Sequence, residues 1–183
     1  MAFQLIASYN RALNSRPLLT KSISTFFIIG ASDALSQYIE SRLQKKSYIQ
    51  NFDMKRCFKL SCYGAFYLAP LLHGWYGFLA KKFPAPGMAS TLKKLSLDQT
   101  FFCSLSIWSF FTAVTLFNGG TLKQGYEKIQ KDYWETLIVN WKVWPAAMMI
   151  NFSFIPLHTQ VIFVNFIALF WNSYLSYISN FKN

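Results

Sequence analysis

The chain has 183 residues, of which 53% are hydrophobic and 19% aromatic, and it carries a formal net charge of +11. This length is enough for one small helical bundle and leaves no room for a separate soluble domain. A nucleic-acid partner is disfavoured, because the basic residues lie between apolar segments and no aromatic–basic motif occurs in a soluble segment. Residues 143–181 contain no Asp, Glu, Lys or Arg. Soluble domains rarely have such a stretch, because their elements alternate buried and wet faces, so the pattern indicates a membrane protein.

The first element expected is a short amphipathic helix within residues 1–16. Phe3, Ile6, Tyr9 and Leu13 recur at helical spacing, and the first 32 residues contain basic side chains and no acid. This composition resembles mitochondrial targeting information and lacks the uninterrupted apolar core of a secretory signal.

The first membrane span is predicted over residues 17–43, with Pro17 placed to start the helix. Asp33 and Gln37 are four residues apart and share one face, with Gly30 one turn earlier. A carboxylate inside a membrane is expensive, so Asp33 is expected to face the interior of the bundle. Two interpretations stay open: a site that faces a cavity or partner, and a hydrogen bond or ion pair to a neighbouring helix.

The second span is predicted over residues 53–82. It contains a stripe of small side chains at four-residue spacing, which lets helices approach closely in lipid. The stripe consists of Cys57, Ser61, Ala65 and Ala69. Pro70 follows the stripe and is expected to kink the helix. His73 then opens a group of aromatic residues typical of a membrane interface.

The third span is predicted over residues 97–117, where Asp98 and Gln99 introduce an apolar segment rich in hydroxyl side chains. These hydroxyls are interpreted mainly as bonding back to helix carbonyls, with a water-lined path as the alternative. A polar connection over residues 121–135, helical in character, is expected to lie at the surface.

The fourth span is predicted over residues 135–156, with Pro145 and Asn151 inside it and Pro156 at its end. An apolar helix over 157–178 follows, and hydropathy does not decide whether both of these last segments cross. The sequence therefore predicts an all-α integral membrane protein with one membrane domain. We expect a compact bundle of four transmembrane helices, built from five apolar segments, with the amphipathic N-terminal helix in addition.

Lys and Arg side chains fill the connections between spans, so anionic lipid headgroups are the expected partners. The basic residues lie on both sides, and no orientation follows. The three cysteines form no C-x-x-C pair and are interpreted as packing residues. His73 and His158 lie far apart without acidic neighbours, which disfavours a metal site. No cofactor is expected. No paired carboxylates or nucleophile–base pair occur, so an enzyme is disfavoured.

An ordered set of motifs covers nearly the whole chain. It comprises Gly30-x-x-Asp33-x-x-x-Gln37, Asp53-x-x-Arg56, Gly64, Pro70-x-x-His73-x-Trp75-Tyr76, Asp98-Gln99, Trp144-Pro145, Asn151-Phe152, Pro156-Leu157 and Trp171-Asn172-x-Tyr174-Leu175-Ser176. With this set the chain resembles the Mpv17/PMP22 family of mitochondrial inner-membrane and peroxisomal membrane proteins. The resemblance implies four transmembrane spans and a pore or channel role that supports membrane potential and mitochondrial homeostasis. It also implies no established enzyme activity, and a mitochondrial inner-membrane location with the peroxisomal membrane as alternative.

The chain departs from the family pattern at Ser32, Ala69, Met148 and Gln160, where the family commonly has Gly, Gly, Gln and Arg. Two hypotheses about function remain. The first is a pore for small solutes or ions, whose acids would favour cations. Its candidate lining or buried polar residues are Asp33, Gln37, His73, Asp98, Gln99 and Asn151. The second is a non-conducting structural subunit of a large mitochondrial inner-membrane complex. It would bind other inner-membrane proteins or itself.

Overall fold

The computed structural model describes the backbone of residues 2–45 and 47–181 and the side chains of residues 7–42, 44–45 and 47–173. Within these ranges every regular element is a helix. The chain divides into two compact units. Unit 1 comprises Met1–Phe78 and Pro156–Asn183, and unit 2 comprises Leu79–Ile155.

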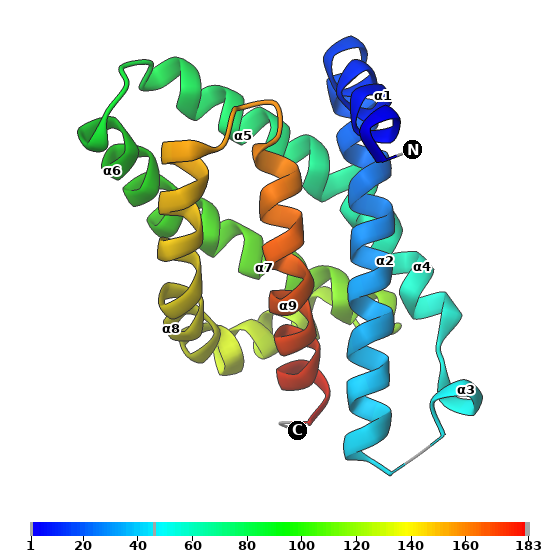
Figure 1. The fold of residues 1–183 in the computed structure, drawn as a ribbon. Coiled ribbons are helices and arrows are strands. Elements are labelled where there is room, and N and C mark those ends of the chain that lie inside the picture. Colours follow the sequence, from blue (N-terminus) through cyan, green and yellow to red (C-terminus); the bar gives the residue numbers. More distant parts are fainter. Residues whose placement is uncertain (1, 46, 182–183) are drawn as a thin grey trace. The chain divides into compact units, whose positions relative to one another are not determined.

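Unit 1 is built around two neighbouring helices that are distant in sequence, α2 and α9 (Figure 1). Its elements are α1 (Ala2–Ser15), α2 (Pro17–Leu43), α3 (Tyr48–Asn51), α4 (Met54–Tyr63), the π-helical turn η1 (Gly64–Leu68), the first part of α5 (Ala69–Lys82) and α9 (Gln160–Phe181). The Asn165 amide donates to the Thr25 hydroxyl at 2.6 Å, and the Ser32 hydroxyl donates to the Leu169 carbonyl at 2.8 Å. From the first bond to the second, the residue numbers increase along both helices, so α2 and α9 run parallel.

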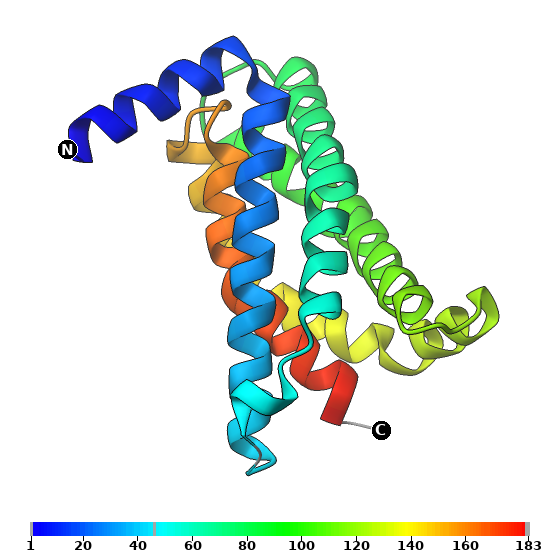
Figure 2. The ribbon, with the colours of Figure 1, turned by 90° about the vertical axis from the view of Figure 1, so that its right-hand side faces the viewer.

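The N-terminal helix α1 leaves the axis of α2 at an angle (Figure 2). Leu13 is only 1% exposed, and the Tyr9 hydroxyl lies 3.0 Å from the Ser24 hydroxyl on α2. These contacts attach the last turns of α1 to the unit. The side chains of Phe3 and Ile6 lie outside the described residues, so the predicted amphipathic face is described only in part.

The small-residue stripe of the second predicted span packs against α2. Ser61, Ala65 and Ala69 are all buried. A Cβ atom on Gly30 would lie 2.8 Å from the Ser61 hydroxyl oxygen, which is closer than such atoms pack. The absence of a side chain at Gly30 therefore lets α2 and α4 approach at this level.

The irregularity expected at Pro70 lies in the turn before it. Residues Gly64–Leu68 form the π-helical turn η1, and the α-helix resumes at Ala69. A proline inside an α-helix clashes with the carbonyl four residues earlier, here Phe66, and a wider turn is one way to move that carbonyl aside. The sequence thus predicted an irregularity at Pro70, and the structure has one in the turn that precedes this residue.

Unit 2 contains the last residues of α5 and two long helical segments. They are α6 (Met88–Leu97), the π-helical turn η2 (Asp98–Phe102) and α7 (Cys103–Phe117), followed by α8 (Leu122–Phe154). Their common core comprises Cys103, Ile107, Phe111, Ile129 and Leu137. The helix therefore begins at Met88, well before the span predicted from residue 97, because apolar patterning marks the apolar part of a helix and not its polar first turns.

The polar connection expected over 121–135 is the beginning of α8. Thr121 caps this helix: its hydroxyl accepts from the Gln124 backbone N–H at 3.3 Å, and its own N–H donates to the Gln124 side chain at 2.8 Å. The helix continues through Pro145 and ends at Phe154, before Pro156. The segment is helical and mostly exposed, as expected, and one long helix joins it to the residues of the predicted fourth span.

Two helices in the described part of the chain are long and apolar enough to cross a membrane, Pro17–Arg42 and Met88–Phe117. Gln160–Ser173 is apolar but shorter. Large apolar side chains also face outward, with Phe27 67% and Phe66 81% exposed. Such surfaces suit lipid and not water. The chain is thus a helical membrane protein, and the number of its helices that cross stays a prediction.

Candidate functional site

Helix α2 is mostly polar where it is buried and mostly apolar where it is exposed. Its outward side carries Leu19, Ile23 and Phe27, which are 50%, 51% and 67% exposed. Its inward side contains one apolar residue, Ile29, which is 6% exposed. Its other buried side chains, which we call the α2 polar face, are at most 7% exposed: Lys21, Thr25, Ser32, Asp33, Ser36, Gln37 and Ser41. From Lys21 to Ser41 this face extends about 30 Å at 1.5 Å per residue, which matches the hydrocarbon core of a bilayer.

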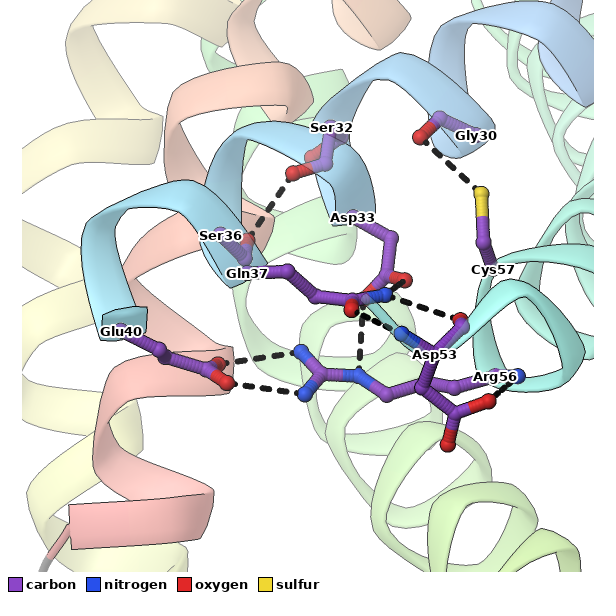
Figure 3. Close-up of polar contacts among 9 residues, drawn as sticks. All are labelled: Gly30, Ser32, Asp33, Ser36, Gln37, Glu40, Asp53, Arg56 and Cys57. Carbon is purple, nitrogen blue, oxygen red and sulfur yellow. Dashed lines mark hydrogen bonds and ion pairs between the residues drawn. The ribbon is translucent and has the colours of Figure 1, made fainter. Parts of the chain in front are cut away.

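Asp33 forms the centre of a polar cluster between α2 and α4 (Figure 3). Its Oδ1 lies 2.9 Å from Nε of Arg56, and the Asp33 side chain is only 2% exposed. Its Oδ2 accepts a 2.8 Å hydrogen bond from the Gln37 side chain. The ion pair to a neighbouring helix, one of the two interpretations left open from the sequence, is thus present.

Arg56 joins two acids of α2. Besides Asp33, it donates through both terminal nitrogens to the Glu40 carboxylate, at 2.9 Å and 3.0 Å. A planar guanidinium matches a carboxylate in this two-bond arrangement, which a lysine cannot reproduce.

Gln37 fixes the start of α4. Its side-chain oxygen accepts from the Asp53 N–H at 2.6 Å, and its nitrogen donates to the Asp53 carbonyl at 3.0 Å. Asp53 is the N-cap of α4 and accepts from the Arg56 N–H at 2.9 Å. The motif Asp53-x-x-Arg56 therefore combines a helix cap with the partner of Asp33. Together these bonds hold the guanidinium in position.

The other end of the α2 polar face contains Lys21, Thr25 and their partners. The Lys21 ammonium lies 3.1 Å from Nδ1 of His73 on α5. One turn further along α2, Thr25 accepts from Asn165 of α9, whose side-chain oxygen is buried without a hydrogen-bond partner among the described residues. His73 thus belongs to this end of the face and not to the Asp33 cluster.

Unit 2 has a separate polar cluster. Asp98 and Gln99 are 4% and 9% exposed, and the Gln99 nitrogen donates to the Asp98 carboxylate at 3.0 Å. The Gln99 side-chain oxygen accepts from Asn140 of α8 at 3.3 Å, and the Trp141 indole donates to the Gln99 carbonyl at 3.3 Å. The cluster therefore connects the π-helical turn η2 with α8.

The six predicted polar residues are all at least partly buried, but they belong to different places. Asp33 and Gln37 lie together in unit 1, and Asp98 and Gln99 lie together in unit 2. Asn151 is fully buried on α8 in unit 2. Sequence reasoning did not assign partners or site roles to several side chains, namely Lys21, Thr25, Glu40, Arg56, Asn140 and Asn165. The signal available for Glu40 was its helical spacing from Asp33, two turns earlier on the same face.

No group of His, Cys, Asp and Glu suited to a metal ion occurs among the described residues. The three cysteines are free thiols, and Cys57 donates to the Gly30 carbonyl at a sulfur–oxygen distance of 3.4 Å. This bond strengthens the close approach of α4 to α2.

Comparison with known proteins identifies the family. The model of the Mpv17 / PMP22 family matches residues 115–176. The chain is 36% identical over 174 residues to Protein SYM1 of Gibberella zeae, covering 94% of this chain and 95% of that protein. The chain belongs to the Mpv17/PMP22 family. The family resemblance expected from the motifs is thus confirmed.

Other family members are similar over nearly the same length. Mitochondrial inner membrane protein Mpv17 of Xenopus laevis is 32% identical over 173 residues, with 94% of this chain and 96% of that protein covered. PXMP2/4 family protein 2 of Dictyostelium discoideum is 34% identical over 171 residues, with 93% and 89% covered. No solved structure matches the chain. The relatives assign this Mpv17/PMP22 protein to the mitochondrial inner membrane, as the sequence predicted.

Proposed function

We propose that this protein is a pore for small solutes or ions in the mitochondrial inner membrane, and that the α2 polar face lines the path. The protein acts without enzymatic chemistry, and four of its helices cross the bilayer. Its lipid partners are anionic headgroups around the basic connections.

The observation that carries this proposal is the reversed polarity of α2. Seven of its eight buried side chains are polar, over about 30 Å, and Ile29 is the exception, whereas Ile23 and Phe27 face outward, both more than half exposed. A helix that only packs in lipid has no need for polar side chains at most of its buried positions. The buried Asn165 oxygen without a partner is a second support, since such atoms usually bind water.

The pairing of Asp33 changes the expected selectivity. An acid bonded to Arg56 at 2.9 Å does not present a free negative charge to a passing cation. Asp98 lies in the separate cluster of unit 2, against Gln99. The geometry therefore gives no support to the cation preference inferred from these two acids.

The second candidate is a non-conducting structural subunit of a larger inner-membrane complex, which would bind other proteins or further copies of itself. The observation in its favour is that several groups on the α2 polar face satisfy one another. Arg56 pairs with Asp33, Asn165 donates to Thr25, and Ser36 donates to the Ser32 carbonyl at 2.9 Å. Bonds of this kind hold helices together without any solute.

Conductance of purified protein in planar bilayers tests the pore proposal. In a background with the three native cysteines replaced, Ser36→Cys introduces a thiol on the α2 polar face, and Ala31→Cys introduces one on the exposed side of the same helix. A small charged thiol reagent should reduce the conductance of the Ser36→Cys variant and leave the Ala31→Cys variant unchanged.

Two results would count against the proposal. Conductance that neither variant alters would remove α2 from the lining of the path. No conductance at any voltage, with a fixed stoichiometry inside a larger particle after gentle purification, would favour the structural-subunit role.

A further inference from the structure

Lys21 is a buried cation with no acidic partner. The residue is 3% exposed, and its ammonium lies 3.1 Å from Nδ1 of His73. Lys21 takes no part in the ion pairs of Arg56 with Asp33 and Glu40, nor in the pair Lys123–Glu127. A buried charge without a counter-charge is among the most unfavourable arrangements in a membrane helix. The burial of Lys21 therefore indicates that a molecule other than this chain supplies its counter-charge.

The sequence around Lys21 contains no acid that could serve as this partner. No Asp or Glu occurs before Asp33, and none occurs in residues 143–181, which include α9. Asp33 lies about 18 Å further along α2 at 1.5 Å per residue and is bonded to Arg56. The counter-charge of Lys21 therefore does not come from the helices that neighbour it.

Lys21 and His73 together offer two kinds of hydrogen-bond donor. The ammonium group has no acceptor site, so it donates and Nδ1 of His73 accepts. The proton of the neutral imidazole is then on Nε2, and this N–H is also available to donate. His73 is half-buried, so its ring can meet both the ammonium and a bound molecule.

The helix ends at this level add to the positive potential. The Thr25–Asn165 and Ser32–Leu169 bonds establish that α2 and α9 run parallel. Lys21 lies one turn before Thr25 on α2, and Val161 lies one turn before Asn165 on α9. The first turn of α9 is therefore level with Lys21. Helix N-termini carry a partial positive charge and favour anions.

We propose that Lys21 and His73 bind a phosphate group, carried by a free phosphate-containing anion or by the headgroup of an anionic phospholipid. A phosphate supplies the missing negative charge, and its several acceptor oxygens suit both donors. Phosphate binding at this site does not require that the protein conducts. The binding proposal and the pore proposal can therefore be tested separately.

The test measures binding to the full-length protein. Thermal unfolding in detergent, with inorganic phosphate replacing chloride at constant ionic strength, gives the affinity for the free anion. Native mass spectrometry from nanodiscs of phosphatidylcholine, with or without phosphatidylglycerol, counts retained anionic lipid. Lys21→Gln should weaken one of these interactions about tenfold or more, which corresponds to ~1.4 kcal/mol. Lys55→Gln is the matched control, because Lys55 is an exposed lysine of the same unit.

A loss of phosphate binding confined to Lys21→Gln identifies a site for a free anion, and a loss of phosphatidylglycerol alone identifies a lipid site. If Lys21→Gln does not fold, His73→Leu replaces it, with the exposed His158→Leu as its control. Equal phosphate and lipid binding by a folded site variant and its control would overturn the proposal. So would the absence of both interactions in the unaltered protein.

Discussion

Asp33 and Arg56 belong to different helices, and Oδ1 of Asp33 lies 2.9 Å from Nε of Arg56. The same guanidinium holds Glu40, so one basic side chain joins two acids of α2 to α4. This relationship explains how α2 tolerates acids on a membrane span, because each has a bonded partner. These ion pairs also join α2 to α4 at one end of the α2 polar face.

We expect Asp33 and Arg56 to be energetically coupled. Arg56→Gln removes the partner of two acids and should destabilise the protein. The loss should stay below the ~3–5 kcal/mol typical of a fully buried pair, because the partly exposed Arg56 side chain is screened by solvent. Asp33→Asn should have a smaller effect, because Arg56 keeps Glu40. The double variant should be more stable than the sum of the two losses predicts, by about 1 kcal/mol or more.

Thermal unfolding of the detergent-purified variants measures this coupling. The exposed pair Lys123–Glu127, 4.0 Å apart on α8, is the control and should show no measurable coupling. Strictly additive losses at Asp33 and Arg56 would contradict the ion pair.

The close packing of α2 on η1 predicts a different response at two glycines. A Cβ atom on Gly64 would lie 2.8 Å from Cγ1 of Ile29 and 3.2 Å from Cγ2 of Thr25, whereas one on Gly74 would meet nothing within 4 Å. Gly64→Ala should lower the midpoint of thermal unfolding. Gly74→Ala should leave it unchanged or raise it, since alanine favours a helix by roughly 0.5–1 kcal/mol over glycine. Equal shifts would show that α2 does not pack closely on η1.

The polar cluster of unit 2 predicts that Gln99 stabilises this unit. Gln99→Leu removes the bonds to Asp98 and Asn140 and leaves the buried Asn140 amide without this acceptor, so a loss of ~1–3 kcal/mol is expected. Gln130→Leu, at an exposed position of α8, is the matched control and should have little effect. The comparison is made by thermal unfolding, and a stable Gln99→Leu variant would mean that η2 and α8 are held by apolar packing alone.

The sequence predicted the elements of this fold better than it predicted their partners. The predicted bounds of the first span, residues 17–43, are those of α2, because an apolar run and a starting proline are local signals. The pairing of Asp33 with Arg56 joins residues on two helices, and a single sequence contains no direct measure of such a contact. Helical spacing indicated that Gln37 would lie beside Asp33, and the structure has that bond.

The errors in the prediction also have local causes. Residues 121–135 are helical and mostly exposed, as expected, but the prediction separated them from the fourth span. In the structure one capped helix continues through these charged residues. Lys21 did not enter the candidate site because a basic residue near the start of a span usually extends to the interface. Its burial against His73 depends on the tertiary packing of α5, which the sequence does not specify on its own.

The last prediction concerns α1, which the sequence associated with mitochondrial targeting. Leu13 is 1% exposed, whereas Leu18, at the start of α2, is 42% exposed. If α1 stays part of the folded protein, Leu13→Ala should destabilise it by ~2–5 kcal/mol, because a fully buried leucine loses its packing and leaves a cavity. Leu18→Ala should have a clearly smaller effect on the thermal unfolding of protein purified from mitochondria. Tyr9→Phe, which removes the bond to Ser24, should shift the midpoint in the same direction as Leu13→Ala and by less. Equal midpoints for the Leu13→Ala and Leu18→Ala variants would mean that the helix contributes nothing to the folded state in the membrane.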